Sequence, residues 1–393
     1  MGKGSVSQSV RKARLARLQT ILARRGIDAA IVWLPAHQHY LSGFLAHIYS
    51  RPIMTYVTPA GSALVVPGLE EDRARSMAIV DQVLAYREQP GLTRADGGAS
   101  AGAAGILGDL LAALPQHGVV GIEAAALPWQ WARMLTDRGL TLVDVGSEIY
   151  RMREVKDEEE QRLLRLAGRL VSIAVRDTLT AFRPGITEPL AELEGNRAVL
   201  EAAAAELPDA WLDLVKTLTA SGVDKSAMPH AVTTNRRLAS PDLGIHRRHV
   251  WLDGYEAECE RTFFLGTPSQ TLTRMFEVMC EAQQAASQAL RGGVLAREVD
   301  RAAREGITRA GYGPNFVHRT GHSIGMEPHE MPDLRHDSDR LLEPGMVVTV
   351  EPGIYVPGVG GVRHSDTFII TEAGSECITF GPKDMTSCVV WRP

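Results

Sequence analysis

The chain has 393 residues, of which 45% are hydrophobic and 23% charged, a composition typical of globular proteins and a length that allows two domains. The net charge of -5 excludes the strongly positive field of a typical nucleic-acid-binding protein. No apolar run reaches the roughly 18 residues of a membrane span, and no signal-type apolar core follows the basic N-terminus, so we expect a cytoplasmic protein without a membrane partner. The four cysteines lack CxxC spacing, which indicates reduced thiols rather than a disulfide framework or a zinc cluster.

Residues 10–150 alternate between helical and strand-like patterns. A basic helix comes first and places its arginines and lysine, among them Arg11 and Arg14, opposite several leucines; we interpret the basic side as a solvated face. Strand-like segments follow at residues 28–33, 54–57, 62–66, 118–122 and 140–145. The stretch 91–105, rich in Gly, Ala, Asp and Ser, predicts a loop. This alternation predicts an α/β domain.

The sequence becomes strongly charged at residues 151–162, where an acidic run opens an Ala- and Leu-rich helix, because acids favour the positive N-terminus of a helix. We place a domain junction there, which predicts domains at 1–152 and 153–393. In the second domain, a helix leading into Arg183-Pro184-Gly185 is echoed 108 residues later by one leading into Arg291-Gly292-Gly293. This weak repeat predicts two similar α/β halves, although chance similarity of two such segments would also explain it.

Two acids lie two residues apart inside an apolar, strand-like run at residues 254–264. Because side chains alternate across a strand, Glu258 and Glu260 are expected on the same face. A buried pair of carboxylates needs a cation to balance its charge. The sequence therefore predicts that a metal ion or a cationic substrate binds there.

Four further polar groups stand in segments that look like strands and turns. His230 follows a proline, His322 lies in a glycine-framed segment shortly before His329, Glu351 precedes Pro-Gly, and His364 follows an arginine. Glycine and proline frames of this kind fix a polar side chain where backbone can approach a ligand closely. We interpret the other histidines as ordinary core or surface groups: His37, His39, His117, His246, His249, His318 and His336.

Taken in this order, the segments resemble the creatinase, prolidase and methionine aminopeptidase superfamily over essentially the whole chain. The resemblance implies an α/β and α+β architecture, with a creatinase-type N-terminal domain followed by a pita-bread domain built from two pseudo-twofold halves. In metal-dependent members, five ligands hold two metal ions. Three of these positions are Glu258, His322 and Glu351 here, but Arg247 and Ser365 stand at the other two.

With two carboxylates lost, two divalent ions would be poorly neutralised and under-coordinated, so we expect no dinuclear metal site. A substitution of the lost ligands by His364, Asp253 or Asp366 is the alternative. Neighbouring residues in a strand face opposite sides, which argues against it.

In having Arg247 and Ser365 at two ligand positions, the chain resembles the creatinase branch, which works without metal. Its Gly-Tyr-x-x-x-x-Glu-Arg-Thr motif stands here at residues 254–262, from Gly254 to Thr262, and His230 precedes Glu260 by thirty residues. In the N-terminal domain, Ser42-Gly43 leads to Tyr49 and Arg51 at the spacing of the residues that reach the substrate in that branch, and His47 stands where the branch has a cysteine.

The resemblance thus implies a metal-independent, creatinase-like amidinohydrolase that needs no cofactor and releases urea and an amino acid from a small guanidino compound bearing a carboxylate. His230 would act as general base, Glu260 and Glu351 would hold the guanidinium, and His322 would orient the site. Arginine donates two parallel hydrogen bonds to a carboxylate, which suits Arg51 to clamp the substrate. The remaining substrate-binding candidates are Tyr49, His47, Tyr255, Glu258, His329, Arg335 and His364.

Three alternatives stay open: a hydrolase or lyase of another small zwitterion, a metal-dependent Xaa-Pro dipeptidase, and a binding module without activity. Glu258, His322, His329 and Glu351 favour the dipeptidase, whereas Arg247 and Ser365 disfavour it. The resemblance also implies a homodimer, in which the N-terminal domain of one chain completes the active site of the other.

Overall fold

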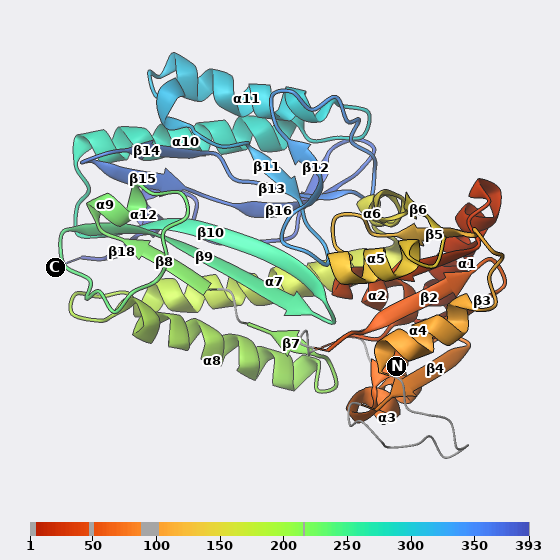
Figure 1. Ribbon diagram of the computed structural model, residues 1–393. Coiled ribbons are helices and arrows are strands. Elements are labelled where there is room, and N and C mark those ends of the chain that lie inside the picture. Colours follow the sequence, from red (N-terminus) through yellow and green to blue (C-terminus); the bar gives the residue numbers. More distant parts are fainter. Residues whose placement is uncertain (1–4, 47–50, 88–101, 215–216, 393) are drawn as a thin grey trace. The chain divides into compact units, whose positions relative to one another are not determined.

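The computed structural model describes residues 5–46, 51–87, 102–214 and 217–392, which divide into two units, one of Val6–Met152 and one that begins at Arg153 (Figure 1). The N-terminal unit contains a six-stranded sheet in the order β4-β3-β2-β1-β5-β6. Its strands are β1 (Ala29–Val32), β2 (Met54–Thr58), β3 (Gly61–Pro67), β4 (Gln82–Tyr86), β5 (Val119–Ile122) and β6 (Thr141–Asp144). Strand β2 pairs antiparallel with β1 and β3, and the other pairs are parallel.

The helices of this unit are α1 (Gln8–Arg25), α2 (Pro35–Ser42), α3 (Glu71–Met77), α4 (Ala103–Leu111), α5 (Trp129–Thr136) and α6 (Gly146–Glu154), with a 3-10 turn at Gly68–Glu70. The predicted basic helix is confirmed as α1, which begins at Ser7, whose side chain accepts a hydrogen bond from the Val10 N–H, and ends at Gly26 in the left-handed conformation. Residues 91–101 of the predicted loop lie outside the described part, and the prediction of a loop is wrong for residues 103–105, because α4 begins at Ala103.

The interpretation of the basic side of α1 as wholly solvated is wrong. Arg11 and Arg14 are buried. The Arg14 guanidinium lies over the ring of Tyr40, 4.2 Å from its centroid, and Arg11 donates a hydrogen bond to the Gly43 carbonyl. The long stems of these arginines therefore join the core of the unit.

The second unit has four layers. Helices α7 (Glu158–Ala181) and α8 (Glu188–Glu206) cover one sheet, and helices α10 (Gln270–Ala289) and α11 (Ala296–Arg309) cover another (Figure 1). The first sheet contains β7 (Leu212–Asp213), β8 (Thr217–Ser221), β9 (Asp242–Leu252), β10 (Tyr255–Leu265) and β18 (Val389–Trp391). The second contains β11 (Gly321–Ser323), β12 (Glu330–Leu334), β13 (Val347–Val350), β16 (Asp366–Ile370) and β17 (Ser375–Cys377).

A two-stranded ribbon and short helical turns complete this unit: β14 (Gly353–Val356), β15 (Gly360–Arg363), α9 (Val223–Ser226), a 3-10 turn at Gly313–Asn315, and α12 (Met385–Cys388). The predicted repeat corresponds to the two helix pairs. Gly185 ends the turn after α7 and Gly293 the turn after α10, both with positive φ, and both donate their N–H groups to carbonyls, of Leu238 and Leu342, at 2.8 Å. The charged segment before α7 forms the predicted helix start, a capping box between Asp157 and Glu160.

A buried ion-pair cluster joins the start of this unit to β12. The Glu330 carboxylate pairs with Arg153 and, at 2.9 Å, with Lys156, and it accepts a hydrogen bond from the Met326 N–H at 2.7 Å. Burial would raise the pKa of Glu330, but the charges of Arg153 and Lys156 outweigh burial and lower the pKa to about 2. The folded state therefore depends on this carboxylate being ionised.

Replacing Glu330 with glutamine is expected to lower the free energy of unfolding at pH 7 by about 3–5 kcal/mol, because two buried cations lose their partner. Since the folded-state pKa of Glu330 lies below its ordinary value of 4.5, its contribution is present above pH 4.5 and is lost as the pH falls toward 2. Denaturant unfolding at pH 7 and pH 3 measures both effects. Glu343→Gln removes an exposed partner of Arg340 and serves as the control, with a change below about 0.5 kcal/mol. An equal loss in both variants would contradict the prediction.

Candidate active site

The turn between β9 and β10 sets the register of the site. Asp253 and Gly254 form a two-residue connection and both have positive φ, 49° and 82°, as a type I′ turn requires. The pairing that follows places Glu258 opposite His249 and Glu260 opposite Arg247. All eleven residues of β10 are buried, so each acid on this strand needs a partner inside the protein.

Two arginines balance the charge of Glu260. Arg247 from β9 and Arg363 from β15 both form ion pairs with the Glu260 carboxylate. Each guanidinium also donates a hydrogen bond to the carbonyl of Pro229, at 3.2 Å. Glu260 thus holds two cations in place, and these cations fix the backbone immediately before His230.

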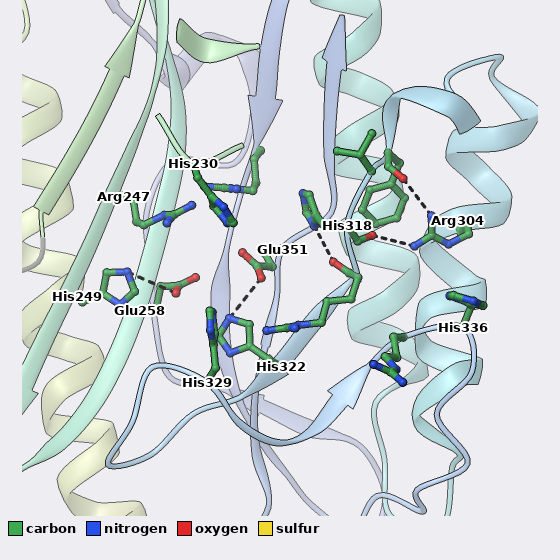
Figure 2. Close-up of a pocket in the computed structure, with 15 residues that line it drawn as sticks. His230, Arg247, His249, Glu258, Arg304, His318, His322, His329, His336 and Glu351 are labelled. Carbon is green, nitrogen blue, oxygen red and sulfur yellow. Dashed lines mark hydrogen bonds and ion pairs between the residues drawn. The ribbon is translucent and has the colours of Figure 1, made fainter. Parts of the chain in front are cut away.

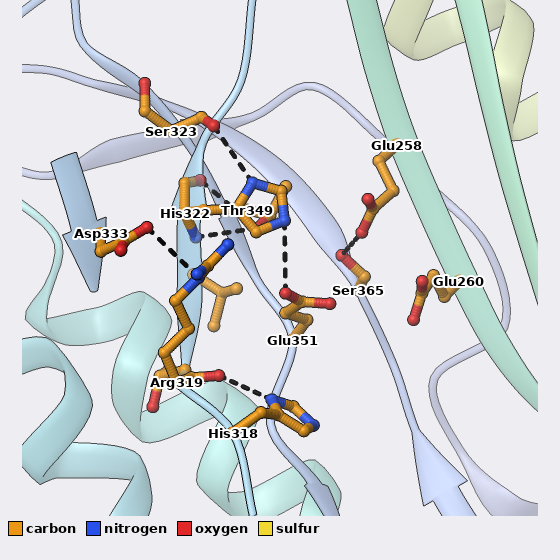
Figure 3. A network of polar contacts seen from close by, with 12 residues as sticks. Glu258, Glu260, His318, Arg319, His322, Ser323, Asp333, Thr349, Glu351 and Ser365 are labelled. Atoms are coloured by element: carbon orange, nitrogen blue, oxygen red, sulfur yellow. Dashed lines mark hydrogen bonds and ion pairs between the residues drawn. The ribbon is translucent and has the colours of Figure 1, made fainter. Parts of the chain in front are cut away.

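Glu258, His322 and Glu351 converge on one point, with one potential ligand atom from each lying within 4.8 Å of the others (Figures 2 and 3). His322 Nδ1 lies 3.1 Å from the Ser323 carbonyl, to which it donates, so Nε2 faces Glu351 Oε1 at 3.3 Å. Three chain segments meet here, because Glu258 lies on β10, His322 on β11 and Glu351 directly after β13.

Two contacts fix Glu258 further. The hydroxyl of Ser365 donates to Glu258 Oε1 at 2.7 Å (Figure 3), and His249 Nε2 lies 3.6 Å from Oε2. Backbone hydrogen bonds between Ser365 and Glu260 join the two sheets at this place. The site therefore lies where the sheet of β10 meets the sheet of β13 and β16.

Burial and the distribution of charge perturb the acids of this cluster. Burial, together with the negative charges of Glu260 and Glu351, raises the pKa of Glu258 to about 7. Burial would also raise the pKa of Glu351, but its hydrogen bond with His322 and the charges of His322 and Arg363 lower it. The pKa of Glu258 is thus raised chiefly by burial and further by the two neighbouring carboxylates, against the lowering effect of His322 and Arg247.

These groups line a cavity of about 810 Å³. The lining residues are His230, Arg247, His249, Glu258, Arg304, Phe316, Val317, His318, Arg319, His322, His329, Arg335, His336, Glu351 and Arg363 (Figure 2). Burial and the nearby guanidinium groups of Arg247 and Arg363 lower the pKa of His230 below its ordinary 6.5, which keeps its ring neutral near pH 7. The lining includes the apolar residues Phe316 and Val317 as well as several arginines.

The structure brings together many of the residues that the sequence predicts. His230, Glu258, His322, His329, Arg335 and Glu351 line the cavity, and Glu260 lies behind Arg247 and Arg363. Two predicted residues lie elsewhere: the Tyr255 hydroxyl donates to Glu160, and His364 packs against Phe276 and Cys388. Arg51 belongs to the N-terminal unit, while His47 and Tyr49 lie outside the described residues.

Several lining residues were missed or assigned to ordinary roles. His249, His318 and His336 were interpreted as ordinary histidines, yet all three line the cavity. His318 donates through Nδ1 to the Arg319 carbonyl at 2.7 Å and accepts from the Tyr355 hydroxyl at 2.9 Å. The Asp253-Gly254 turn was a usable signal for His249, because a two-residue hairpin fixes which residue lies opposite Glu258.

Two models of known protein families match the chain. Residues 162–372 match the model of metallopeptidase family M24, and residues 14–155 match the creatinase/prolidase N-terminal domain. The first match covers more than half of the chain. The chain belongs to metallopeptidase family M24. The predicted superfamily and the predicted order of the two folds are thereby confirmed.

Relatives of this M24 protein include peptidases. An uncharacterised peptidase of Bacillus subtilis (strain 168) is 37% identical over 244 residues, which cover 62% of this chain and 67% of the relative. An Xaa-Pro dipeptidase of Lactobacillus helveticus is 36% identical over 248 residues, covering 62% of this chain and 64% of the relative. Among solved structures, an Xaa-Pro dipeptidase from Bacillus anthracis is 26% identical and has a TM-score of 0.82, covering 95% of this chain and 99% of that protein.

The predicted creatinase-like, metal-independent amidinohydrolase is wrong, because the chain belongs to metallopeptidase family M24 and its relatives include Xaa-Pro dipeptidases. The structure supplies the physical reason. The prediction required Glu260 to hold a cationic substrate, but the cations beside Glu260 are Arg247 and Arg363 of the protein itself. Glu260 is also completely buried.

Membership of family M24 implies a bound metal ion, and three residues of the cavity are suited to hold one ion. Glu258, Glu351 and His322 offer two carboxylates and one imidazole, and the Ser323 carbonyl accepts from Nδ1 of His322, so that Nε2 is left as the donor atom for a metal. Such a mixed nitrogen and oxygen donor set suits Zn²⁺ or Mn²⁺.

The described part of the chain also has no helix that is long and apolar enough to cross a membrane.

Proposed function

We propose that the protein is a metal-dependent peptidase that cleaves Xaa-Pro dipeptides. One observation carries the proposal: Glu258, His322 and Glu351 converge as potential ligands inside a cavity of an M24 chain. A divalent ion held by these three residues would supply Lewis acidity toward the scissile carbonyl. The names of the relatives support the choice of substrate class.

His230 is the residue suited to move protons in this reaction. It lines the cavity, and its lowered pKa leaves the ring neutral, so it can accept a proton from the attacking water and return that proton to the leaving nitrogen of proline. The hydrogen bonds from Arg247 and Arg363 to the Pro229 carbonyl hold the backbone that carries this ring. Proton transfer therefore relies on residues that the fold holds in position.

The rest of the cavity suits a small zwitterion with an apolar ring. Phe316 and Val317 offer an apolar surface for the proline ring or for the first side chain. Arg319 and Arg335 line the same cavity and can pair with the C-terminal carboxylate of a dipeptide. A volume of about 810 Å³ accommodates a dipeptide.

A substrate panel tests this proposal. The protein is stripped with a chelator, reloaded with Mn²⁺ or Zn²⁺, and offered Ala-Pro, Ala-Ala and Ala-Ala-Pro. We expect release of proline from Ala-Pro, little hydrolysis of the other two, and loss of activity in the stripped sample. Absence of Ala-Pro hydrolysis with every ion would reject the proposed activity.

The homodimer and the cytoplasmic location remain part of the proposal. The four cysteines are free thiols, which supports a reducing compartment. If Arg51 of one chain completes the site that contains His230 of another, mixing Arg51→Ala with His230→Ala subunits restores about a quarter of the sites. Proline release before and after mixing measures this recovery. No recovery, although heterodimers form, would reject a shared site.

A further inference from the structure

A fixed positive charge lies beside the three potential metal ligands. Arg247 stands opposite Glu260 in the β9–β10 hairpin, and its side chain reaches the cavity while remaining only 14% exposed. Its Nε faces the Glu260 carboxylate and its Nη2 donates to the Pro229 carbonyl. The guanidinium is therefore held from two directions and cannot easily move away from a second cation.

The contacts of the two Glu258 carboxylate oxygens also argue against a second metal ion. A carboxylate that bridges two ions uses both of its oxygens. In this protein Oε1 of Glu258 accepts a hydrogen bond from Ser365 at 2.7 Å, and Oε2 lies 3.6 Å from His249 Nε2. Ser365 offers a neutral hydroxyl rather than a carboxylate, so it adds no negative charge for a further ion.

The balance of charge around the cluster permits one divalent ion. Glu258, Glu260 and Glu351 carry three negative charges when ionised, and Arg247 and Arg363 carry two positive charges. One divalent ion brings this group to a small net positive charge. A second would add two more positive charges beside a guanidinium in a buried place, where the repulsion between like charges is strong.

We propose that the site binds a single divalent ion and that the Arg247 guanidinium takes the place of a second one, presenting its charge to an oxygen of the bound peptide. This inference rests on the metal dependence of the proposed function. Glu260 serves as the positioning residue that holds Arg247, and Ser365 keeps Glu258 from bridging two ions. The site would thus contain one exchangeable cation, the metal ion, and one permanent cation, the Arg247 guanidinium.

Metal content tests this inference without any assay of activity. Wild type and the double variant Arg247→Asp, Ser365→Glu are equilibrated with Mn²⁺, dialysed, and analysed for bound metal. We expect one ion per wild-type chain and two per double-variant chain, whereas Arg304→Asp, which changes an arginine on another wall of the cavity, leaves the number at one. Two ions or none in the wild type, or one ion in a folded double variant, would overturn the inference.

Electron paramagnetic resonance of the Mn²⁺-loaded wild type gives a second reading that needs no variant. An isolated ion gives an uncoupled spectrum, and the exchange-coupled spectrum of an ion pair would overturn the inference even if the double variant fails to fold. The two proposals fail separately. One bound ion without hydrolysis of Ala-Pro rejects the peptidase, whereas hydrolysis with two bound ions rejects the role of Arg247.

Discussion

Replacing Glu351 with glutamine is expected to lower kcat/KM for Ala-Pro by more than about 100-fold and to weaken Mn²⁺ binding by a similar factor. Changes to residues that merely support a metal ligand already cost about 10- to 100-fold, so loss of a charged ligand should cost more. The Glu351 carboxylate lies 3.3 Å from His322 Nε2 and faces the cavity, so the substitution removes negative charge where the ion would bind. Steady-state kinetics and isothermal titration with Mn²⁺ measure the two effects.

The matched control for Glu351 is Glu343→Gln. Glu343 pairs with Arg340 near the surface and does not line the cavity. Its replacement should leave both kcat/KM and Mn²⁺ affinity within about twofold of wild type, because exposed ion pairs contribute little. Normal Mn²⁺ affinity in Glu351→Gln would contradict the assignment of Glu351 as a ligand.

Replacing His230 with alanine is expected to lower kcat by about 100- to 10,000-fold, the range of general acid–base catalysis, with little change in KM. His230 is not among the three potential ligands, so the variant should keep the bound ion and the thermal stability of the wild type. Kinetics, metal content and thermal unfolding of one preparation measure all three quantities. A loss of metal along with activity would show that His230 acts by holding the site together rather than by transferring protons.

Val232→Ala provides the control for His230. Val232 lies two residues further along the same loop and is exposed, so its truncation perturbs the loop without removing a titratable group. We expect kcat within about twofold of wild type, as for a typical surface substitution. A large loss of activity in this variant would indicate that the loop, rather than the imidazole, sets the rate.

Much of the site follows from local patterns in the sequence. The alternation of side chains along a strand predicts that Glu258 and Glu260 share a face, and the glycine and proline frames single out His322 and Glu351. The Asp253-Gly254 turn likewise fixes which residues of β9 lie opposite those of β10. These features depend on residues that are close together in the chain.

The identity of the cation at Glu260 could not be predicted in the same way. Arg363 lies 103 residues beyond Glu260, and it reaches the carboxylate only because the segment around Ser365 pairs with β10. Without that long-range pairing, a metal or a substrate was the natural choice of partner. The creatinase-like function was predicted wrongly because the pairing of Arg363 with Glu260 was not foreseen. A buried carboxylate without a known partner looks like a site for a guanidinium substrate.

A titration of metal-stripped protein with Mn²⁺, with the initial rate of proline release from Ala-Pro recorded at each addition, tests the central claim most directly. Hydrolysis at a site that binds one ion predicts almost no rate in the stripped protein and a linear rise that ends at one equivalent of Mn²⁺ per chain. Proline release at full rate by the stripped protein, or no release at any Mn²⁺ concentration, would contradict a metal-dependent peptidase at Glu258, His322 and Glu351.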